Sequence, residues 1–189
     1  MLRKKTNSQK KETRSKVVNA LFLRGEVITE ISAEAKEFYD QSRLGDLKKT
    51  GKVHLSLIEG LFLIEKKRLN VFDGRNHLLT EEEYLRKAVK QQPNFLIRYA
   101  VFKDLRERGY IVKTALKFGA DFRVYDRGIK PGEDHAKWVV FPVHEGSVLT
   151  WQDFAAKNRV AHSTKKRLLL GVVDDEGDVS YWECRWIRP

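Results

Sequence analysis

Residues 117–141 read KFGADFRVYDRGIKPGEDHAKWVVF. β-Branched and aromatic residues at 121–125 and 136–141 predict two strands, and the two glycines and one proline between them predict a long turn. Tyr125 then ends the first strand, and His135 begins the second. Side chains at the two ends of one turn can face a common cleft, so this turn is the first candidate for a functional site.

The chain after Pro93 predicts a mixed α/β layer of two helices and five strands. In the first helix Leu96, Ala100 and Leu105 fall on an apolar side, and Gly109 is a typical helix stop. The predicted elements are a helix at 95–109, strands at 110–116, 121–125 and 136–143, a helix at 151–163 after Thr150, and two strands around the acidic turn 174–178.

The chain before Pro93 predicts a smaller mixed α/β domain. It contains a hairpin around Arg24-Gly25, a polar connection at 45–55 and a strand at 68–72. Capping residues mark three helix starts, at Ser32, at Ser56 with Glu59, and at Thr80 with Glu83. The residue before a proline is disfavoured in helix, which places the domain boundary at Pro93. The predicted organisation is a basic flexible tail at 1–16, an N-terminal domain at 17–92 and a C-terminal domain at 95–189, in an α/β (α+β) fold.

Composition favours an intracellular globular protein without a cofactor. Of the 189 residues, 41% are hydrophobic and 33% charged, which is ordinary for a soluble domain. No run approaches the roughly 18 to 20 apolar residues of a membrane span, and the N-terminus lacks the apolar stretch of a secretory signal, so we expect a cytoplasmic protein. One cysteine excludes an internal disulfide and a cysteine-rich zinc site, and the five histidines show no metal-ligand spacing. We therefore expect no metal and no cofactor.

The net charge of +11 favours a polyanionic partner, because lysine and arginine bind nucleic acid by releasing its counterions. The charge is unevenly distributed: residues 1–16 carry seven Lys/Arg and one Glu. This tail is either a solubilising, partly artificial extension or an arm that holds nucleic acid. The rest of the chain, with a surplus of +5, is only a moderate candidate by charge alone.

Several motifs resemble one family in order and spacing. LRERGYIVKTALKFGADFRVYDRG, HAKWVV, RVAHSTKKRLLLGVVDDEGDVSYW and the final RP are similar to the C-terminal nuclease domain of the archaeal tRNA-splicing endonucleases. LSLIEGLFLIEKKRL resembles their N-terminal domain. The resemblance implies cleavage of precursor tRNA at both intron ends within a bulge-helix-bulge. It also implies attack by a ribose 2′-hydroxyl, which gives 2′,3′-cyclic phosphate and 5′-hydroxyl ends.

The resemblance assigns three catalytic roles, to Tyr125 as general base, His135 as general acid and Lys166 as the cation that stabilises charge. Such a reaction does need one group to take a proton, one to give a proton and one fixed cation beside the phosphorane. Histidine is a natural acid near neutral pH. Tyrosine, with a reference pKa near 10, acts as base only beside cations, or it merely orients the hydroxyl. Lys165 is the rival to Lys166, and the register of RVAHS-x-x-K favours Lys166.

Two arginines match the family residues that sandwich an unstacked bulge base between guanidinium planes. Arg159 in RVAHS matches one of them, and Arg185, preferred to Arg188, matches the other; a phosphate-facing or salt-bridged arginine is the plainer alternative. The remaining histidines are interpreted as structural or surface residues. They are His54, His77, His144 and His162.

The acidic turn carries four carboxylates, Asp174, Asp175, Glu176 and Asp178. In the family this loop inserts into a basic cleft of a neighbouring subunit; a solvated hairpin turn and, least of all, a metal site are the alternatives. The resemblance implies four nuclease-like units, and a chain of 189 residues is not a fused double-length one. The expected assembly is a homotetramer, or a heterotetramer with a structural subunit.

Two other functions fit a small mixed α/β domain. A metal-dependent nuclease of the restriction-enzyme type needs a carboxylate and then Asp/Glu-x-Lys on the next strand. That spacing fails here, because Glu133 and Lys137 are four apart and His135 occupies the strand start. A non-catalytic structural subunit of the splicing enzyme would lose the three catalytic residues, and all three candidates are present.

Overall fold

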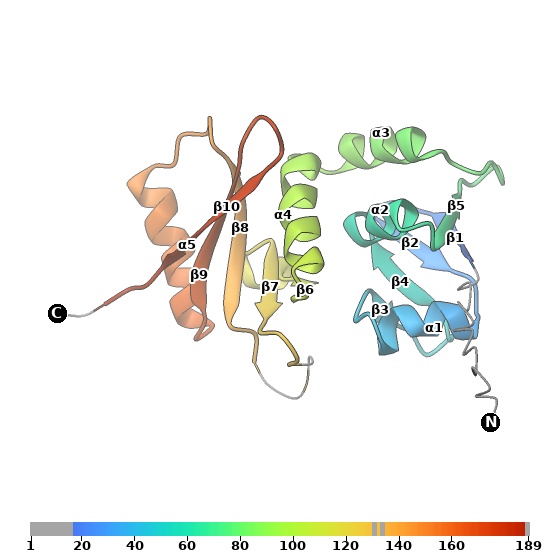
Figure 1. The fold of residues 1–189 in the computed structure, drawn as a ribbon, viewed down its shortest axis with the longest axis horizontal. Helices are drawn as coiled ribbons and strands as arrows, with labels where there is room; N and C mark the ends of the chain where they lie inside the picture. The colour runs from blue at the N-terminus through green and yellow to red at the C-terminus, as the bar shows by residue number, and fades with distance from the viewer. Residues whose placement is uncertain (1–16, 130–131, 133–134, 188–189) are drawn as a thin grey trace, which may run out of the picture.

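The computed structural model describes residues 17–129, 132 and 135–187, so the predicted tail at 1–16 lies outside the described residues. Two five-stranded mixed sheets lie side by side, each with its own helices (Figure 1). This arrangement confirms the predicted α/β (α+β) class. In the described part of the chain, no helix is long and apolar enough to cross a membrane.

The N-terminal half forms around a sheet with the strand order β3-β4-β2-β1-β5. The turn at Gly25, whose φ is 79°, joins the first two strands as predicted. Ser32, Ser56 and Thr80 each cap a helix, and Glu59 and Glu83 complete the predicted capping boxes. The elements are β1 (Val18–Phe22), β2 (Glu26–Thr29), α1 (Ala33–Asp40), β3 (Asp46–Leu47), β4 (Val53–Ser56), α2 (Leu57–Glu65), β5 (Leu69–Phe72) and α3 (Glu81–Gln91). The stretch predicted as a polar connection therefore contains two strands.

The C-terminal half has the strand order β10-β9-β8-β7-β6. β8 and β9 run parallel because helix α5 connects them, whereas the other pairs are antiparallel. The elements are α4 (Phe95–Glu107), β6 (Ile111–Thr114), the short 3₁₀ helix η1 (Leu116–Phe118), β7 (Phe122–Tyr125), β8 (Trp138–His144), α5 (Trp151–Ser163), β9 (Arg167–Val173) and β10 (Val179–Cys184). The predicted sequence of helix, three strands, helix and two strands is confirmed.

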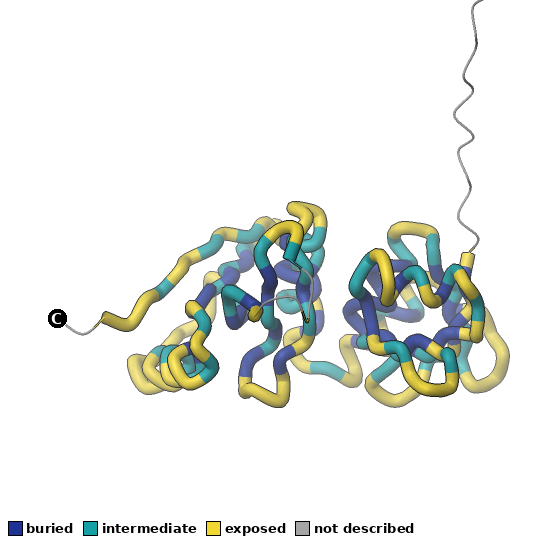
Figure 2. The backbone as a smooth tube through the Cα atoms, turned by 90° about the horizontal axis from the view of Figure 1, so that it is seen from below, coloured by how far each residue is buried: buried dark blue, intermediate teal, exposed yellow. Residues whose placement is uncertain are grey.

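Helices cover both faces of the C-terminal sheet (Figure 1). Successive residues of a strand point to opposite faces, so Phe122 and Val124 of β7 pack with α4, whereas Arg123 and Tyr125 point to the other face. Val139 and Leu168 on that second face pack against Ala161 of α5. Figure 2 shows the buried positions inside both halves and an outer surface of α5 that is largely exposed. β7 thus presents a polar pair beside α5.

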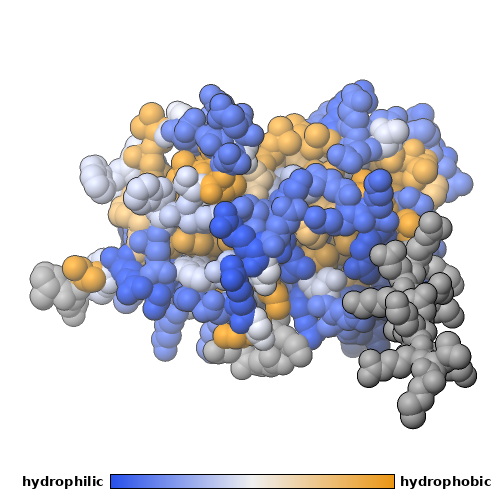
Figure 3. Space-filling model, in the orientation of Figure 1, coloured by the Kyte–Doolittle hydropathy of each residue, from blue (hydrophilic) through white to orange (hydrophobic). Residues whose placement is uncertain are grey.

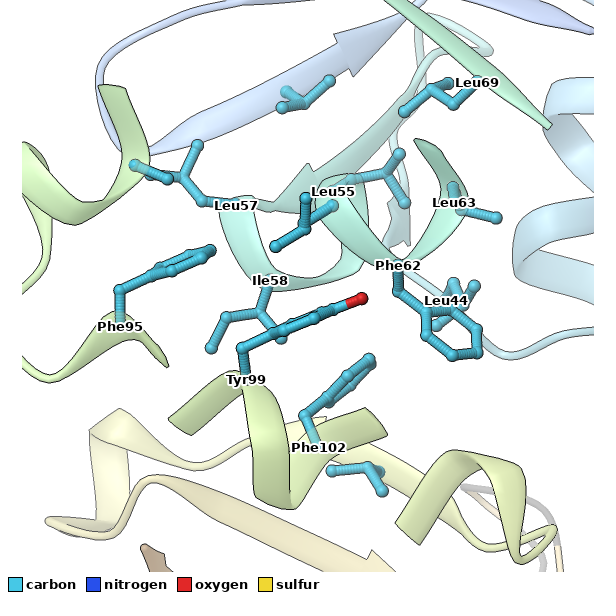
Figure 4. Close-up of a cluster of buried hydrophobic side chains, with 14 of the residues drawn as sticks. Leu44, Leu55, Leu57, Ile58, Phe62, Leu63, Leu69, Phe95, Tyr99 and Phe102 are labelled. Carbon is cyan, nitrogen blue, oxygen red and sulfur yellow. The ribbon is translucent and has the colours of Figure 1, made fainter. Parts of the chain in front are cut away.

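α4 also joins the two halves. Phe102 of α4 meets Phe62 of α2 edge to face, with ring centroids 5.7 Å apart, and Phe95 and Tyr99 point toward the same helix (Figure 4). Polar contacts add to this core, since Lys113 Nζ donates to the Gly45 carbonyl at 2.6 Å. The predicted division into 17–92 and 95–189 stays a prediction, because the halves share one core.

The surface seen in Figure 3 is mostly hydrophilic, with smaller hydrophobic patches between charged side chains. Such a distribution is ordinary for a folded protein, and a patch identifies a site only together with other features.

Candidate active site

One cavity of about 540 Å³ brings the three predicted catalytic residues together. Tyr125, His135 and Lys166 line it, and they come from a strand end, a loop and the turn after a helix. Arg123 and Phe118 complete much of its wall. Tyr125 and Lys166, which are 41 positions apart in the chain, therefore line one cavity, as their proposed roles in one reaction require.

Tyr125 is fixed by the sheet. It is the last residue of β7 and is paired with Ile111 of β6, and its side chain is only 4% exposed. Its hydroxyl makes no hydrogen bond to any residue that the structure describes. The phenol is thus held rigidly by its strand and leaves its polar atom free for another group in the cavity.

His135 lies before its predicted strand rather than in it. β8 begins at Trp138, because the first ladder contact on this side is the Lys137 N–H donating to the Val124 carbonyl at 2.9 Å. The prediction that His135 starts the strand is therefore wrong by three residues. The imidazole is exposed and still lines the cavity.

The turn after α5 decides between the two candidate lysines. Lys165 adopts a left-handed backbone with φ of 54° and is exposed, whereas Lys166 is half-buried and lines the cavity. Lys166 Nζ donates to the Thr164 carbonyl at 2.8 Å. Burial, and to a lesser extent the charge of Arg123, lowers the pKa of Lys166 from its ordinary value. The geometry therefore favours Lys166, as the motif register did.

Two further hollows lie on the same side of the C-terminal half and share lining residues in turn. Lys166 also lines a hollow of about 260 Å³ with Arg185 and Trp186. A third hollow, of about 570 Å³, shares Arg185 and Trp186 with the second one and adds Arg159. The two predicted base-binding arginines thus line one hollow, and a second hollow shares residues with both it and the catalytic cavity.

Comparison with known proteins identifies the family. The family model for the catalytic C-terminal domain of tRNA intron endonucleases matches residues 95–181, and that for their N-terminal domain matches residues 18–85. The chain belongs to the tRNA intron endonuclease family. It carries the catalytic domain of that family, and it is therefore an endonuclease.

Curated relatives of this tRNA intron endonuclease are archaeal. The tRNA-splicing endonuclease of Nanoarchaeum equitans is 45% identical over 141 residues, which are 71% of this chain and 90% of the relative. That of Thermococcus onnurineus is 40% identical over 152 residues, covering 80% and 86%. That of Pyrococcus furiosus is 39% identical over 175 residues, covering 92% and 99%.

Trp186 is a residue of this endonuclease that the sequence argument missed. It is 60% exposed, and the centroid of its ring lies 4.8 Å from that of His162. Both residues line the same hollow as Arg159. His162 was interpreted as a structural or surface residue, and the structure places it, exposed, in the last turn of α5. The signal in the sequence was an aromatic residue beside a basic one in the C-terminal run RWI.

Arg185 is held by Glu183. Its Nε donates to Glu183 Oε1 at 2.6 Å, and Trp138 Nε1 donates to Glu183 Oε2 at 2.7 Å. The Trp138 hydrogen bond, followed by Arg185 and Arg167, lowers the pKa of the Glu183 carboxyl to about 2. The salt-bridged alternative for Arg185 is thus observed, although the guanidinium still lines the hollow. Arg188 lies outside the described residues.

Glu183 gives this endonuclease a specific acid dependence. Because its pKa is lowered in the folded state, its contribution to stability is present above the ordinary carboxyl pKa of 4.5 and is lost as the pH falls toward about 2. We expect Glu183→Gln to be less stable than wild type at neutral pH and the difference to shrink at about pH 3. Urea unfolding at both pH values measures this, with Glu145→Gln as an exposed control. A difference that is independent of pH would contradict it.

The acidic turn lies between β9 and β10. Asp174 Oδ1 accepts from the Asp178 N–H at 2.8 Å, and Gly177 has a φ of 88°, as a tight hairpin needs. Asp175 is 81% exposed and pairs with His144 at 3.1 Å. Most carboxylates of the acidic turn therefore remain available for a partner. Among the described side chains, no three His, Cys, Asp or Glu residues gather as a metal site.

Two other histidines also pair with carboxylates. His54 Nδ1 lies 2.9 Å from Glu26, and His77 Nε2 lies 3.3 Å from Glu83. Both lie in the N-terminal half and outside the catalytic cavity, so the structure gives them the structural or surface positions expected from sequence.

Proposed function

We propose that this endonuclease cleaves precursor tRNA at both intron boundaries, within a bulge-helix-bulge. The 2′-hydroxyl at each boundary attacks the adjacent phosphate, so that the new bond from the 2′-oxygen to phosphorus replaces the bond to the 5′-oxygen. The products are a 2′,3′-cyclic phosphate and a 5′-hydroxyl. The single observation that supports this best is the cavity shared by Tyr125, His135 and Lys166.

Each of the three side chains has a different role in the reaction. Tyr125 takes the proton of the attacking 2′-hydroxyl or orients it, and His135 gives a proton to the departing 5′-oxygen. Lys166 stabilises the negative charge that grows on the phosphorane. The buried tyrosine on its strand provides fixed positioning for the nucleophile, while the exposed histidine on its loop faces the side from which a bulky RNA approaches.

The hollow lined by Arg159, Arg185 and Trp186 supports a role in bulge recognition. Arg159 is exposed at the surface of α5, and Arg185 faces the same hollow beside the exposed indole of Trp186. Guanidinium planes and an indole stack well on an unpaired base, which suits extraction of a bulge nucleotide. We propose that Arg159 and Arg185 hold such a base near the scissile phosphate.

Product analysis tests this function. We expect the purified protein to cut a bulge-helix-bulge RNA at two positions in excess EDTA, with the substrate folded in monovalent salt, because the three side chains themselves supply proton transfer and charge stabilisation. The 5′ fragments should end in cyclic phosphate, which acid converts to a 2′ or 3′ monophosphate. Loss of cutting while the RNA stays folded and bound would favour the metal-dependent rival. Cutting of a fully paired RNA at the same rate would exclude bulge recognition.

We further propose that the endonuclease assembles as a tetramer, either alone or with a structural subunit, and that the acidic turn docks on a neighbouring chain. Exposed carboxylates at a hairpin tip suit docking against cations, and desolvated charge pairs make an assembly sensitive to their loss. Replacing Asp174, Asp175, Glu176 and Asp178 with Asn or Gln keeps the turn and removes its charge.

We expect this quadruple variant to stay folded, to dissociate into smaller species and to lose cleavage. Light scattering at several concentrations gives the mass, and circular dichroism confirms the fold. A control that neutralises Glu81 and Glu82, exposed carboxylates on α3, should keep the wild-type mass. A folded quadruple variant with unchanged mass and activity would restore the plain solvated hairpin.

A further inference from the structure

Arg123 lines the catalytic cavity with Tyr125 and Lys166. It lies two residues before Tyr125 on β7, so both side chains point to the same face of the sheet. The β-sheet fixes its backbone, which pairs with Lys113 of β6 on one side and Val139 of β8 on the other. Its guanidinium therefore has a defined position beside the groups to which catalytic roles are assigned above.

The guanidinium of Arg123 has no anionic partner among the residues that the structure describes. Its Nε is buried and makes no hydrogen bond. Desolvating such a donor without an acceptor is costly. Arg68, Arg98 and Arg106 also have a buried Nε without a hydrogen bond, but Arg123 is the one of these four arginines that lines the catalytic cavity. A donor that is kept unpaired inside a cavity indicates that a ligand supplies the acceptor.

Aromatic rings rather than carboxylates orient this side chain. The guanidinium carbon lies 5.9 Å from the ring centroid of Phe118 and 5.9 Å from that of Tyr125. Cation–π contacts of this kind hold the charge in place without neutralising it. Tyr125 thus lies beside a positive charge that its own ring helps to orient.

Positive charge accumulates around Arg123. Lys113 lies directly opposite it on β6, and like charges at such positions are unfavourable. The charge of Arg123 also contributes to the lowered pKa of Lys166, after burial. The ammonium group of Lys113 interacts with the carboxylates of Glu59 and Asp46 as well as with Arg123, whereas Lys166 donates only to the Thr164 carbonyl, which leaves its charge unneutralised. An anion placed between Arg123 and Lys166 would relieve this repulsion.

We infer that Arg123 is a further catalytic residue, whose guanidinium binds a nonbridging oxygen of the scissile phosphate together with Lys166. The inference rests on the proposed function, because it takes the ligand in the cavity to be an RNA phosphodiester. The planar fork of donors in arginine matches two phosphate oxygens, whereas a lysine acts as a point charge. Arg123 would hold the phosphate in line with the 2′-hydroxyl and stabilise the phosphorane as it forms.

Single-turnover cleavage of a bulge-helix-bulge RNA tests this role. We expect Arg123→Gln to lower the rate by about 10²- to 10³-fold, as loss of a preorganised donor does, and Arg123→Lys to recover part of it. Arg127→Gln is the matched control, because Arg127 is exposed, lies outside the cavity and rests on the ring of Tyr110. It should cleave at nearly the wild-type rate.

Two readouts separate phosphate contact from a merely structural role. A sulfur replacing the contacted nonbridging oxygen should slow the wild-type enzyme, but it should slow Arg123→Gln much less, because that contact is already lost. Guanidinium ion, well below denaturing concentrations, should restore cleavage by Arg123→Ala. An equal sulfur effect in wild type and variant, without rescue, would overturn the inference.

The outcomes also separate this inference from the proposed function. A wild-type protein that does not cleave the RNA contradicts the function itself. An active wild type with an equally active Arg123→Gln contradicts only the role of Arg123. If circular dichroism shows that Arg123→Gln is unfolded, Arg123→Lys decides, since it keeps the charge but lacks the planar donors that hold the oxygen, and it should show a smaller sulfur effect than wild type.

Discussion

A single 2′-deoxyribose at the nucleotide 5′ to one scissile phosphate is expected to reduce cleavage at that boundary below detection, while the other boundary is still cut. The proposed nucleophile is the 2′-hydroxyl itself, so its removal leaves no group to form the cyclic phosphate. The cavity contains acid, base and cation candidates in Tyr125, His135, Lys166 and Arg123, and none of these replaces the missing oxygen. Denaturing gel analysis of a substrate labelled at both ends measures the two cuts separately.

This result is meaningful only if the enzyme still binds the modified RNA. Competition with the all-ribose substrate shows binding, and a 2′-deoxy sugar one nucleotide away is the matched control, because it leaves the nucleophile in place. Cleavage at the deoxy position would mean that water attacks the phosphate. The metal-dependent rival would then regain support, and the three catalytic assignments would need to be revised.

Local signals in the sequence predicted most of the fold. Capping boxes depend on residues three apart, so Ser56 with Glu59 and Thr80 with Glu83 located two helices from the sequence alone. Packing between residues far apart in the chain was harder to predict from the sequence. Leu96 was placed on the apolar side of α4 but is 55% exposed, whereas Phe95 and Tyr99, which face α2 of the N-terminal half, are buried. The buried positions of such a helix follow from tertiary contacts rather than from one helical period.

Short strands were the second limit. β3 has two residues and β4 has four, and the lysine-rich stretch between them resembles a connection in composition. β4 pairs with β2, and β3 pairs with β4. The first of these pairings joins Val27 and Leu55, which are nearly thirty positions apart. The predicted start of β8 at His135 failed for the same reason. Hydrogen bonding to β7, rather than β propensity, determines where β8 begins.

Residues of the candidate site that belong to family motifs could be predicted from the sequence. Residues that matter only through their contacts in the fold could not. The motif register selected Lys166 before the left-handed turn at Lys165 gave a physical reason for the choice. Arg123 could not be identified in this way, because an arginine in a strand is ordinary until its missing partner is seen. Its place two residues before Tyr125 was the only signal in the sequence, and it becomes informative only when both face a cavity.

Removing the acid or the cation is expected to cause the other large loss. We expect His135→Ala and Lys166→Ala each to lower single-turnover cleavage by about 10²- to 10⁴-fold, with RNA affinity changed much less. Both side chains act on charge that develops in the transition state. His135 is exposed, and Lys166 makes one hydrogen bond, to the Thr164 carbonyl, so circular dichroism of each variant should match wild type. Lys165→Ala, which removes an exposed neighbour outside the cavity, is the control and should remain active.

Tyr125→Phe decides the most demanding assignment of the three. The substitution keeps the ring that packs at the end of β7 and over which the Arg123 guanidinium lies, so it removes only the hydroxyl. Because that hydroxyl has no hydrogen-bond partner among the described residues, its loss should leave the folded protein as stable as wild type. A strong loss of single-turnover cleavage with unchanged stability would therefore place the phenol oxygen in the reaction. A near-normal rate would reduce Tyr125 to packing and leave His135, Lys166 and Arg123 to account for the chemistry.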